Sequence, residues 1–230
     1  MTTTDTFGLY ITRLLVNPKH QRAQRELEQP YELHRTLMSL FPELPEPCMD
    51  FRHFYGVLHR VETDPVTGFP SIILQSKIAP KEEAVASLGT FLLPRAPGPV
   101  TRLLPPPDQF LVPCRSFRFR LRANVTKKVD TKSGPDGKRR NGRRVAVRGE
   151  EALRLWLARK EAQHGFRTSV LTRIQAEPDL RGKDKKSALA STLFEGRFVV
   201  ENPDALGVAL QEGIGSAKAY GFGLLSVAPG

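Results

Sequence analysis

The sequence predicts an α+β protein built from two tandem domains, and three observations support this fold class. First, 230 residues fit one large domain or two domains of roughly 100 residues each. Second, segments with strand and helix patterns follow one another in a similar order in both halves of the chain. Third, a proline-rich stretch at 94–113 lies between the halves. We therefore expect an N-terminal domain at 1–93, a linker at 94–113 and a C-terminal domain at 114–230.

The first half begins with a strand. Residues 8–15 alternate and carry mostly apolar side chains on both faces, which is typical of a central strand. A helix is then expected from Pro30, because the first helical position does not need the N–H that proline lacks, and it ends before Pro42. The segment between them is polar, and we assign no helix or strand to it. The other elements expected here are a hairpin formed by 51–62 and 71–77, and a weaker helix at 81–88.

The linker prediction depends on proline content. Residues 92–113 contain seven prolines, three of them consecutive at Pro105, Pro106 and Pro107. Proline cannot donate a hydrogen bond to a strand ladder and fixes the backbone angle φ. We therefore expect a semi-rigid spacer without regular structure.

The second half opens with the clearest strand pattern in the chain, residues 114–124. Apolar and arginine side chains alternate, so one face is predicted to enter a core and the other to be basic. A Gly-rich basic loop follows at 127–144, and Val145 and Val147 indicate a short return strand. The remaining expected elements are a helix at 150–163, strands at 166–174 and 192–200 joined by a turn near 182, and a helix from Asn202 to Gly213. The order strand–helix–strand–strand–helix–strand in each half is the ferredoxin-like, or RRM-like, pattern.

Composition excludes several classes of protein. Hydrophobic residues make up 40% of the chain, which is too many for an intrinsically disordered protein. No run of about 18 apolar residues is present to form a membrane span, and the first residues lack the pattern of a secretion signal. Cys48 and Cys114 are too few for a disulfide framework or a four-thiolate zinc site. We expect a cytoplasmic protein that does not contact a membrane.

The net charge of +11 comes from one segment. Residues 115–148 hold thirteen Lys and Arg against two acids, whereas acids and bases balance in the rest of the chain. A localised basic patch is typical of a partner with a phosphate backbone. The alternative is a solvated loop that keeps the protein soluble.

His34 and Tyr31 are the candidate catalytic residues. Three residues apart on a helix, they lie about 60° apart on a helical wheel, at the edge of the apolar arc. Histidine can accept and donate protons near neutral pH. The alternative is a boundary histidine that packs beside a tyrosine.

The C-terminal segment 213–223 is a second candidate site. It contains Gly213, Gly215, Gly221 and Gly223 around Lys218. Glycines let backbone N–H groups approach a phosphate, and the lysine adds charge. The alternative is a tight turn that fits the last strand against its neighbour.

No metal or cofactor motif accompanies these residues. The five histidines form no His-Glu-x-x-His pattern, no cysteine pair has zinc-finger spacing, and no Walker loop or Gly-x-Ser-x-Gly elbow occurs. We expect no cofactor, no metal, and acid–base chemistry if the protein is an enzyme.

Several segments together resemble the CasE family of CRISPR-associated endoribonucleases, which process precursor CRISPR RNA in type I-E Cascade systems. The similar segments run in order along the chain: LYITRLLVNP at 9–18, PYELHRTL at 30–37, FRLRAN at 119–124, LFEG at 193–196 and GIGSAKAYGFGLLSVAP at 213–229. Their order and spacing across the chain make the resemblance specific.

The resemblance implies two tandem ferredoxin-like domains and a metal-independent endoribonuclease. Such an enzyme cuts at the 3′ base of a repeat stem-loop by attack of a 2′-OH, which leaves a 2′,3′-cyclic phosphate and a 5′-OH. The position of His34 is then catalytic, as base or acid, and Tyr31 is its active-site neighbour. Expected partners are the CRISPR repeat stem-loop, as pre-crRNA and crRNA, and other Cascade subunits.

RNA binding is expected mainly through phosphates and shape, because the bases of A-form RNA are hidden in a deep, narrow major groove. The expected RNA-binding residues are Arg35, Arg118, Arg120, Arg122, Lys127, Lys128, Lys138, Arg139, Arg140, Arg143, Arg144, Gly213, Gly215, Lys218, Gly221 and Gly223. Two other functions stay open: a non-catalytic scaffold that binds RNA hairpins, and a basic ribosome-associated protein.

Overall fold

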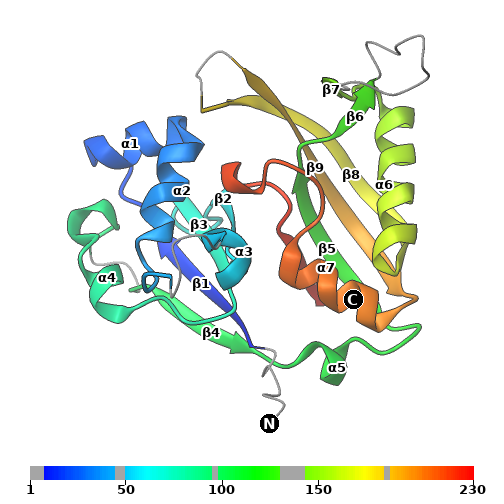
Figure 1. Ribbon diagram of the computed structural model, residues 1–230, viewed down its shortest axis with the longest axis horizontal. Coiled ribbons are helices and arrows are strands. Elements are labelled where there is room, and N and C mark those ends of the chain that lie inside the picture. The colour runs from blue at the N-terminus through cyan, green and yellow to red at the C-terminus, as the bar shows by residue number, and fades with distance from the viewer. Residues whose placement is uncertain (1–7, 45–49, 95–97, 130–142, 184–186) are drawn as a thin grey trace.

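Two four-stranded antiparallel sheets, each with its own helices, make up the molecule (Figure 1). The computed structural model describes residues 8–44, 50–94, 98–129, 143–183 and 187–230. In these ranges both halves of the chain have the strand–helix–strand–strand–helix–strand order, and the predicted fold class, α+β with two tandem ferredoxin-like domains, is confirmed.

The N-terminal sheet has the strand order β2-β3-β1-β4, with β1 in the interior as its apolar faces predicted. Its strands are β1 (Leu9–Leu15), β2 (Leu58–Thr63), β3 (Pro70–Ser76) and β4 (Val100–Leu104). The helices of this half are α1 (Gln21–Glu28), α2 (Pro30–Met38), α3 (Phe51–Tyr55), α4 (Glu82–Ala86) and the 3-10 turn η1 (Gly89–Phe91).

The C-terminal sheet repeats this arrangement with the order β10-β5-β9-β8. Its strands are β5 (Ser116–Ala123), β8 (Phe166–Arg181), β9 (Ala188–Val200) and β10 (Leu225–Pro229). A two-stranded ribbon, β6 (Thr126–Val129) with β7 (Arg143–Ala146), follows β5. The helices are α5 (Pro107–Phe110), α6 (Glu150–His164), α7 (Pro203–Glu212) and the 3-10 turn η2 (Lys218–Tyr220).

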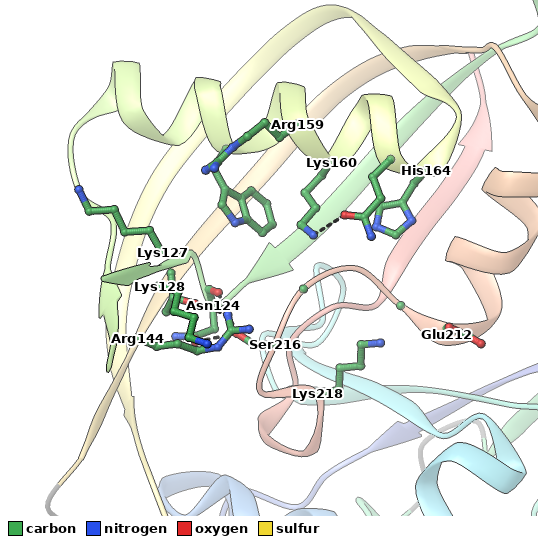
Figure 2. A pocket seen from close by; sticks show the side chains of 15 residues that line it. Asn124, Lys127, Lys128, Arg144, Arg159, Lys160, His164, Glu212, Ser216 and Lys218 are labelled. Atoms are coloured by element: carbon green, nitrogen blue, oxygen red, sulfur yellow. Dashed lines mark hydrogen bonds between the residues drawn. The ribbon is translucent and has the colours of Figure 1, made fainter. Parts of the chain in front are cut away.

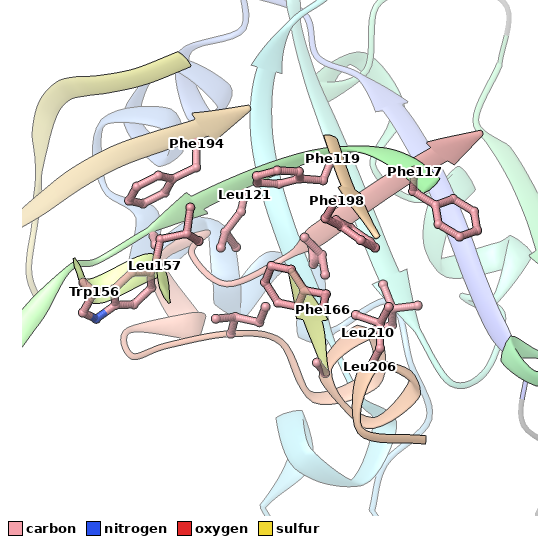
Figure 3. Close-up of a cluster of buried hydrophobic side chains, with 14 of the residues drawn as sticks. Phe117, Phe119, Leu121, Trp156, Leu157, Phe166, Phe194, Phe198, Leu206 and Leu210 are labelled. Atoms are coloured by element: carbon pink, nitrogen blue, oxygen red, sulfur yellow. The ribbon is translucent and has the colours of Figure 1, made fainter. Parts of the chain in front are cut away.

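Each sheet buries one face against its own helices. In the C-terminal half the alternation of β5 places Phe117, Phe119 and Leu121 in a core with Trp156 of α6 and Leu210 of α7 (Figure 3). Side chains of successive strand residues point to opposite faces, so the same alternation turns the three arginines of β5 away from this core. The predicted core face of residues 114–124 is confirmed.

Buried hydrogen bonds join the two sheets. Arg60 of β2 is 3% exposed, and its guanidinium donates to the carbonyl of Leu224 (2.9 Å) and the hydroxyl of Ser226 (2.8 Å). Gln75 of β3 donates to the carbonyl of Leu210 (2.6 Å). These hydrogen bonds join strands of the N-terminal sheet to the C-terminal half, so they help to fix how the two halves sit together.

The prediction for 51–62 is wrong in its first part, because Phe51–Tyr55 is a helix. Asp50 caps it by accepting a hydrogen bond from the backbone N–H of His53 (2.8 Å), and Gly56 ends it at φ 60°. An aspartate before the first turn and a glycine after the last turn are ordinary helix signals, and here they prevail over the apolar strand pattern. The hairpin itself, β2 with β3, is confirmed.

The proline-rich segment is not free of regular structure, contrary to prediction. Residues Val100–Leu104, which hold no proline, pair with β1 as the edge strand β4 of the N-terminal sheet. Prolines stand on both sides of this strand, where the ladder needs no donor from them. The division into 1–93, 94–113 and 114–230 stays a prediction, with β4 assigned to the first sheet.

Two further differences concern helices and strand length. The polar segment after β1 forms α1, which the lack of an apolar period did not predict. Strand β8 continues to Arg181, seven residues beyond the predicted end. In the part of the chain that the structure describes, we find no helix with the length and hydropathy of a membrane span.

Candidate active site and nucleic-acid interface

Helix α2 presents the predicted pair at its rim. Pro30 occupies the first turn, and Leu33 and Leu37 are buried against the sheet. This orientation leaves Tyr31 and His34 half-buried, with ring centroids 6.3 Å apart. The helical spacing therefore brings the imidazole and the phenol together as predicted.

A second histidine, which the sequence analysis missed, lies beneath the first. His59 of β2 is 1% exposed, and its ring stacks on that of His34 at 6.1 Å between centroids. The Nδ1 atom of His34 and the Nε2 atom of His59 are buried without a hydrogen-bond partner among the described residues. Such unpaired buried nitrogens are uncommon in protein structures and are typical of sites where a ligand completes the bonding.

Burial keeps both imidazoles neutral. It lowers the pKa of His34 from 6.5 to about 4; the charge of Arg52 adds to this effect, and Asp50 opposes it. Burial also lowers the pKa of His59 to about 3, with smaller contributions from His34 and Arg122. A neutral imidazole has a free lone pair, so at neutral pH His34 offers a hydrogen-bond acceptor and not a positive charge.

The glycine-rich segment packs against this pair. Tyr220 of η2 contacts Tyr31, with 5.9 Å between ring centroids. A Cβ atom at Gly221 would lie 3.4 Å from Nε2 of His59, so the backbone of the segment lies directly on the buried histidine. The C-terminal half thus completes a site whose histidines come from the N-terminal half.

Two of the four glycines close the segment on itself. The N–H of Ile214 donates to the carbonyl of Gly223 (2.9 Å), and both Gly213 and Gly223 have positive φ angles, 77° and 87°. A Cβ atom at Gly213 would lie 2.9 Å from the Gly223 carbonyl, and one at Gly223 would lie 2.9 Å from the Ile214 carbonyl. These two positions therefore need glycine for backbone packing, which is the architectural alternative raised from the sequence.

A basic groove of about 680 Å³ lies beside the same segment (Figure 2). Ribbon β6–β7, helix α6 and the glycine-rich segment form its walls. The groove is lined by Asn124, Thr126, Lys127, Lys128, Arg144, Trp156, Arg159, Lys160, Gln163, His164, Glu212, Gly213, Gly215, Ser216 and Lys218. Six of these side chains are Lys or Arg and one is an acid, so the groove can hold a polyanion.

The pKa values of two lysines in the groove are lowered, partly by neighbouring positive charges. Burial lowers the pKa of Lys160, and the nearby charges of Arg159 and Arg144 add to the effect. Burial likewise lowers the pKa of Lys218, with Arg52 as the next cause. Bringing like charges together costs free energy, and bound phosphates would relieve that cost.

The groove and the histidine pair both adjoin the glycine-rich segment. Lys218 lines the groove, and Tyr220, two residues later, contacts Tyr31. The charge of Arg52 lowers the pKa of both His34 and Lys218, so its guanidinium acts at the junction.

The structure gathers some of the expected RNA-binding residues and not others. Lys127, Lys128, Arg144, Gly213, Gly215 and Lys218 line the groove, and Gly221 and Gly223 lie in the adjoining segment. Arg143 begins β7. Lys138, Arg139 and Arg140 lie outside the described residues. The sequence analysis missed Arg159, Lys160 and His164, although their spacing on a predicted helix could have indicated one basic face.

The arginines of β5 have a structural role that was not foreseen. Arg120 pairs with Glu195 (2.6 Å) and Glu62 (3.2 Å), and Arg122 pairs with Glu177 (2.7 Å). Arg118 donates to the carbonyl of Pro229 (3.2 Å). The predicted basic face of this strand is therefore largely neutralised by carboxylates that the sequence places far away. Outside β5, Arg35 is exposed and pairs with Glu32 (3.3 Å).

No metal site is evident in the described ranges. Among those residues no three His, Cys, Asp or Glu side chains cluster as metal ligands would. Cys114 is an exposed free thiol, and Cys48 lies outside the described residues. The described site offers an unprotonated imidazole, a phenol and a groove lined by basic side chains.

Comparisons with known proteins identify the family of the chain. The model of a family described as CRISPR associated protein matches residues 9–229. The chain is 29% identical over 237 residues to the CRISPR-associated endoribonuclease Cse3 of Thermus thermophilus, covering 96% of this chain and all of the relative. It is 33% identical over 202 residues to the CRISPR system Cascade subunit CasE of Escherichia coli, covering 86% of this chain and 92% of the relative.

Solved structures show the same similarity. A structure of Thermus thermophilus Cse3 bound to an RNA that represents a pre-cleavage complex matches with a TM-score of 0.75 at 29% identity, covering 97% of this chain and all of that one. The crystal structure of Cas6e from Escherichia coli matches with a TM-score of 0.65 at 25% identity, covering 96% and 99%. Both similarities include the two sheets and the segments that carry the candidate site.

Proposed function

The chain belongs to the CRISPR associated protein family whose model matches residues 9–229, and from this premise we propose that it is the endoribonuclease that cuts precursor CRISPR RNA at the 3′ base of the repeat stem-loop. Relatives that align over most of the chain are named an endoribonuclease and a Cascade subunit, and one was solved with RNA before cleavage. The chain is then an enzyme that keeps its crRNA product and joins other Cascade subunits.

One observation carries the proposal: the glycine-rich segment that lines a basic groove also contacts Tyr31 and His59, the two neighbours of a neutral, half-buried imidazole, His34. With a pKa of about 4, the imidazole of His34 is unprotonated at neutral pH and its lone pair is open to the 2′-OH proton, and the groove can hold the phosphates of an RNA stem. A site that only binds RNA needs the groove but not the neighbouring pair of an imidazole and a phenol.

The proposed reaction uses the RNA's own 2′-OH as nucleophile. His34 accepts the 2′-OH proton while the 2′ oxygen bonds to the scissile phosphorus and the bond from phosphorus to the 5′ oxygen breaks. The 5′ oxygen takes up a proton from the Tyr31 hydroxyl or from water, so the products are a 2′,3′-cyclic phosphate and a 5′-OH. Tyr31 positions the phosphate or assists the proton transfer. Every step can be performed by side chains, so we propose that cleavage requires no metal.

Binding and location follow from the same reasoning. We propose that the RNA stem lies along Lys127, Lys128, Arg144 and Lys160, and that its base reaches Lys218 and the glycine-rich segment. Phosphates provide most of the affinity in such a complex. We place the protein in the cytoplasm, where a Cascade subunit meets CRISPR transcripts.

The decisive experiment is single-turnover cleavage of a 5′-labelled repeat RNA in the presence of EDTA. We expect the native protein to release a 2′,3′-cyclic phosphate product, and a 2′-deoxy substitution at the cut to stop cleavage. His34→Ala should lower the rate by about 10²–10⁴, the usual contribution of one acid–base group, with affinity nearly unchanged. Tyr31→Phe should slow cleavage less.

His53→Ala is the matched control, because this histidine is exposed on the neighbouring helix α3. It should cut at the native rate. Tight binding without cleavage by the native protein would favour the non-catalytic scaffold instead. If the protein binds unrelated RNA equally well, it is a general basic RNA-binding protein.

A further inference from the structure

Lys183 reaches the catalytic helix from the far end of a long hairpin. Strands β8 and β9 are longer than the other strands of the C-terminal sheet and extend beyond them. Their far ends lie beside α2 (Figure 1). There the ammonium of Lys183 lies 5.0 Å from the ring centroid of Tyr31. The backbone N–H of Lys183 donates to the hydroxyl of Tyr220 (3.2 Å). Three segments distant in sequence therefore meet at Tyr31.

The ammonium has no carboxylate partner within the described residues. Glu32 lines the same small cavity, but its carboxylate pairs with Arg35 (3.3 Å). A cation over a tyrosine ring is weakly attracted, and the contact leaves its three N–H donors without a hydrogen-bond acceptor. Lys183 is exposed, so an anion from solution can reach it.

The position of this cation suits the reaction. The Tyr31 ring, which Lys183 contacts, is 6.3 Å from the ring of His34. A phosphate that both rings touch lies within the reach of a lysine side chain held at the same tyrosine. Attack of the 2′ oxygen places additional negative charge on the nonbridging oxygens of that phosphate, and a fixed cation stabilises it.

We propose that Lys183 is a further catalytic residue, which hydrogen-bonds a nonbridging oxygen of the scissile phosphate and stabilises the five-coordinate transition state. It keeps its proton throughout; the 2′-OH proton goes to His34, and the bond to the 5′ oxygen breaks as described above. The inference rests on the proposed function and adds to it a residue from the hairpin β8–β9.

The competing role for Lys183 is mechanical. Its contacts with Tyr31 and Tyr220 could fasten the hairpin to α2 and do nothing else. A fastening role predicts losses of stability and affinity, whereas charge stabilisation predicts a loss of rate in the bound complex. If Lys183 only fastens the hairpin, saturating protein should restore the cleavage rate of a Lys183 variant. If Lys183 stabilises charge, the rate should stay low at saturation.

The experiment measures single-turnover cleavage at saturating protein for the native chain, Lys183→Ala and Lys183→Arg. Lys183→Ala should cut about 10²-fold more slowly, the scale of losing one donor to a developing oxyanion, while affinity falls no more than about threefold. Lys183→Arg keeps the charge and should recover part of the rate. Lys81→Ala, an exposed lysine near helix α4, should behave as the native chain.

A sulfur substitution at the scissile phosphate tests the contact itself. With separate Rp and Sp phosphorothioate repeats, the native protein should cut one isomer more slowly, and Lys183→Ala should lose most of that difference. A native saturating rate for Lys183→Ala, or an unchanged sulfur effect, overturns the inference. If His34→Ala is inactive in the same assay, only Lys183 is misassigned; if the native protein does not cut at all, the proposed function fails, and the inference with it.

Discussion

Protonation of His34 should be unusually difficult in the free protein and easier once RNA is bound. Burial, and then the charge of Arg52, lowers its pKa from 6.5 to about 4. At 1.36 kcal/mol per pKa unit this is roughly 3 kcal/mol against the charged imidazole, so about one molecule in 10²–10³ carries that charge at pH 6.5–7. The scissile phosphate adds a negative charge beside the ring, and such a charge typically raises a pKa by about 1–3 units. In the complex we expect a pKa between about 5 and 7.

The sign of the stability effect follows from the same shift. Below pH 6.5 His34 binds a proton in the unfolded chain but stays unprotonated in the folded chain. The free energy of unfolding therefore decreases as pH falls from 6.5 to about 4. His59, with a pKa lowered to about 3, contributes in the same direction and over a wider range. Stability from these two groups is complete above pH 6.5.

The assay is an NMR titration of the protein labelled in its histidine side chains, with His34 assigned by a His34→Asn variant. Free protein is compared with a complex that contains a 2′-deoxy repeat, which cannot be cut. Arg52→Gln should raise the pKa of His34 in the free protein, because it removes a nearby positive charge. The pH dependence of kcat/KM should break near pH 4, and that of kcat at a higher pH.

A pKa near 6.5 for His34 in the free protein would refute the reasoning, because it would show that burial does not disfavour the charged ring. The same pKa with and without RNA would refute the placement of the scissile phosphate. Both outcomes are measured by NMR titration alone, so neither depends on a cleavage assay.

Three other expectations follow from the groove and the domain contact. Lys160→Gln and Arg144→Gln should each weaken repeat binding and reduce the slope of log affinity against log salt by about 0.7–0.9, measured by fluorescence anisotropy; an unchanged slope would remove that residue from the interface. Lys218→Ala should weaken binding at an unchanged melting temperature, whereas Gly223→Ala should cost about 1–3 kcal/mol of stability because φ is 87° and the new Cβ would meet the Ile214 carbonyl. Arg60→Met should lower the free energy of unfolding in urea by about 2–3 kcal/mol, since it removes buried hydrogen bonds between the sheets; a smaller loss would mean that water replaces them.

Much of the fold could be predicted because local pattern and tertiary packing agree. The alternation of residues 116–123 and the caps around α7 specify their elements without help from the rest of the chain. Helix α1 could not be predicted, because its inward side is Ala23 and the buried acid Glu26, which pairs with Arg22 (2.6 Å). Helix α1 is stabilised by its packing against α2. A search for periodic apolar residues does not detect such contacts.

The site could be predicted where one helix supplies it and not where the fold assembles it. Tyr31 and His34 are neighbours by helical spacing alone. His59, Tyr220 and Lys183 join them from β2, η2 and the end of β8, and their approach depends on how the two sheets dock. For the same reason the sequence predicts a basic face at Arg120 and Arg122 without their ion pairs. The carboxylate partners lie on other strands, which only the tertiary structure brings near.

The dependence of the site on the glycine-rich segment has a consequence for synthesis. His34 leaves the ribosome early, but Tyr220 and Gly221, which cover Tyr31 and His59, follow about 190 residues later. At roughly 5–20 residues per second, the nascent chain spends about 10–40 s with helix α2 made and the candidate site open. A ribosome-bound chain in that interval carries the histidine but not the surface that directs RNA to it. We therefore expect nuclease activity to begin only when nearly the whole chain has been made.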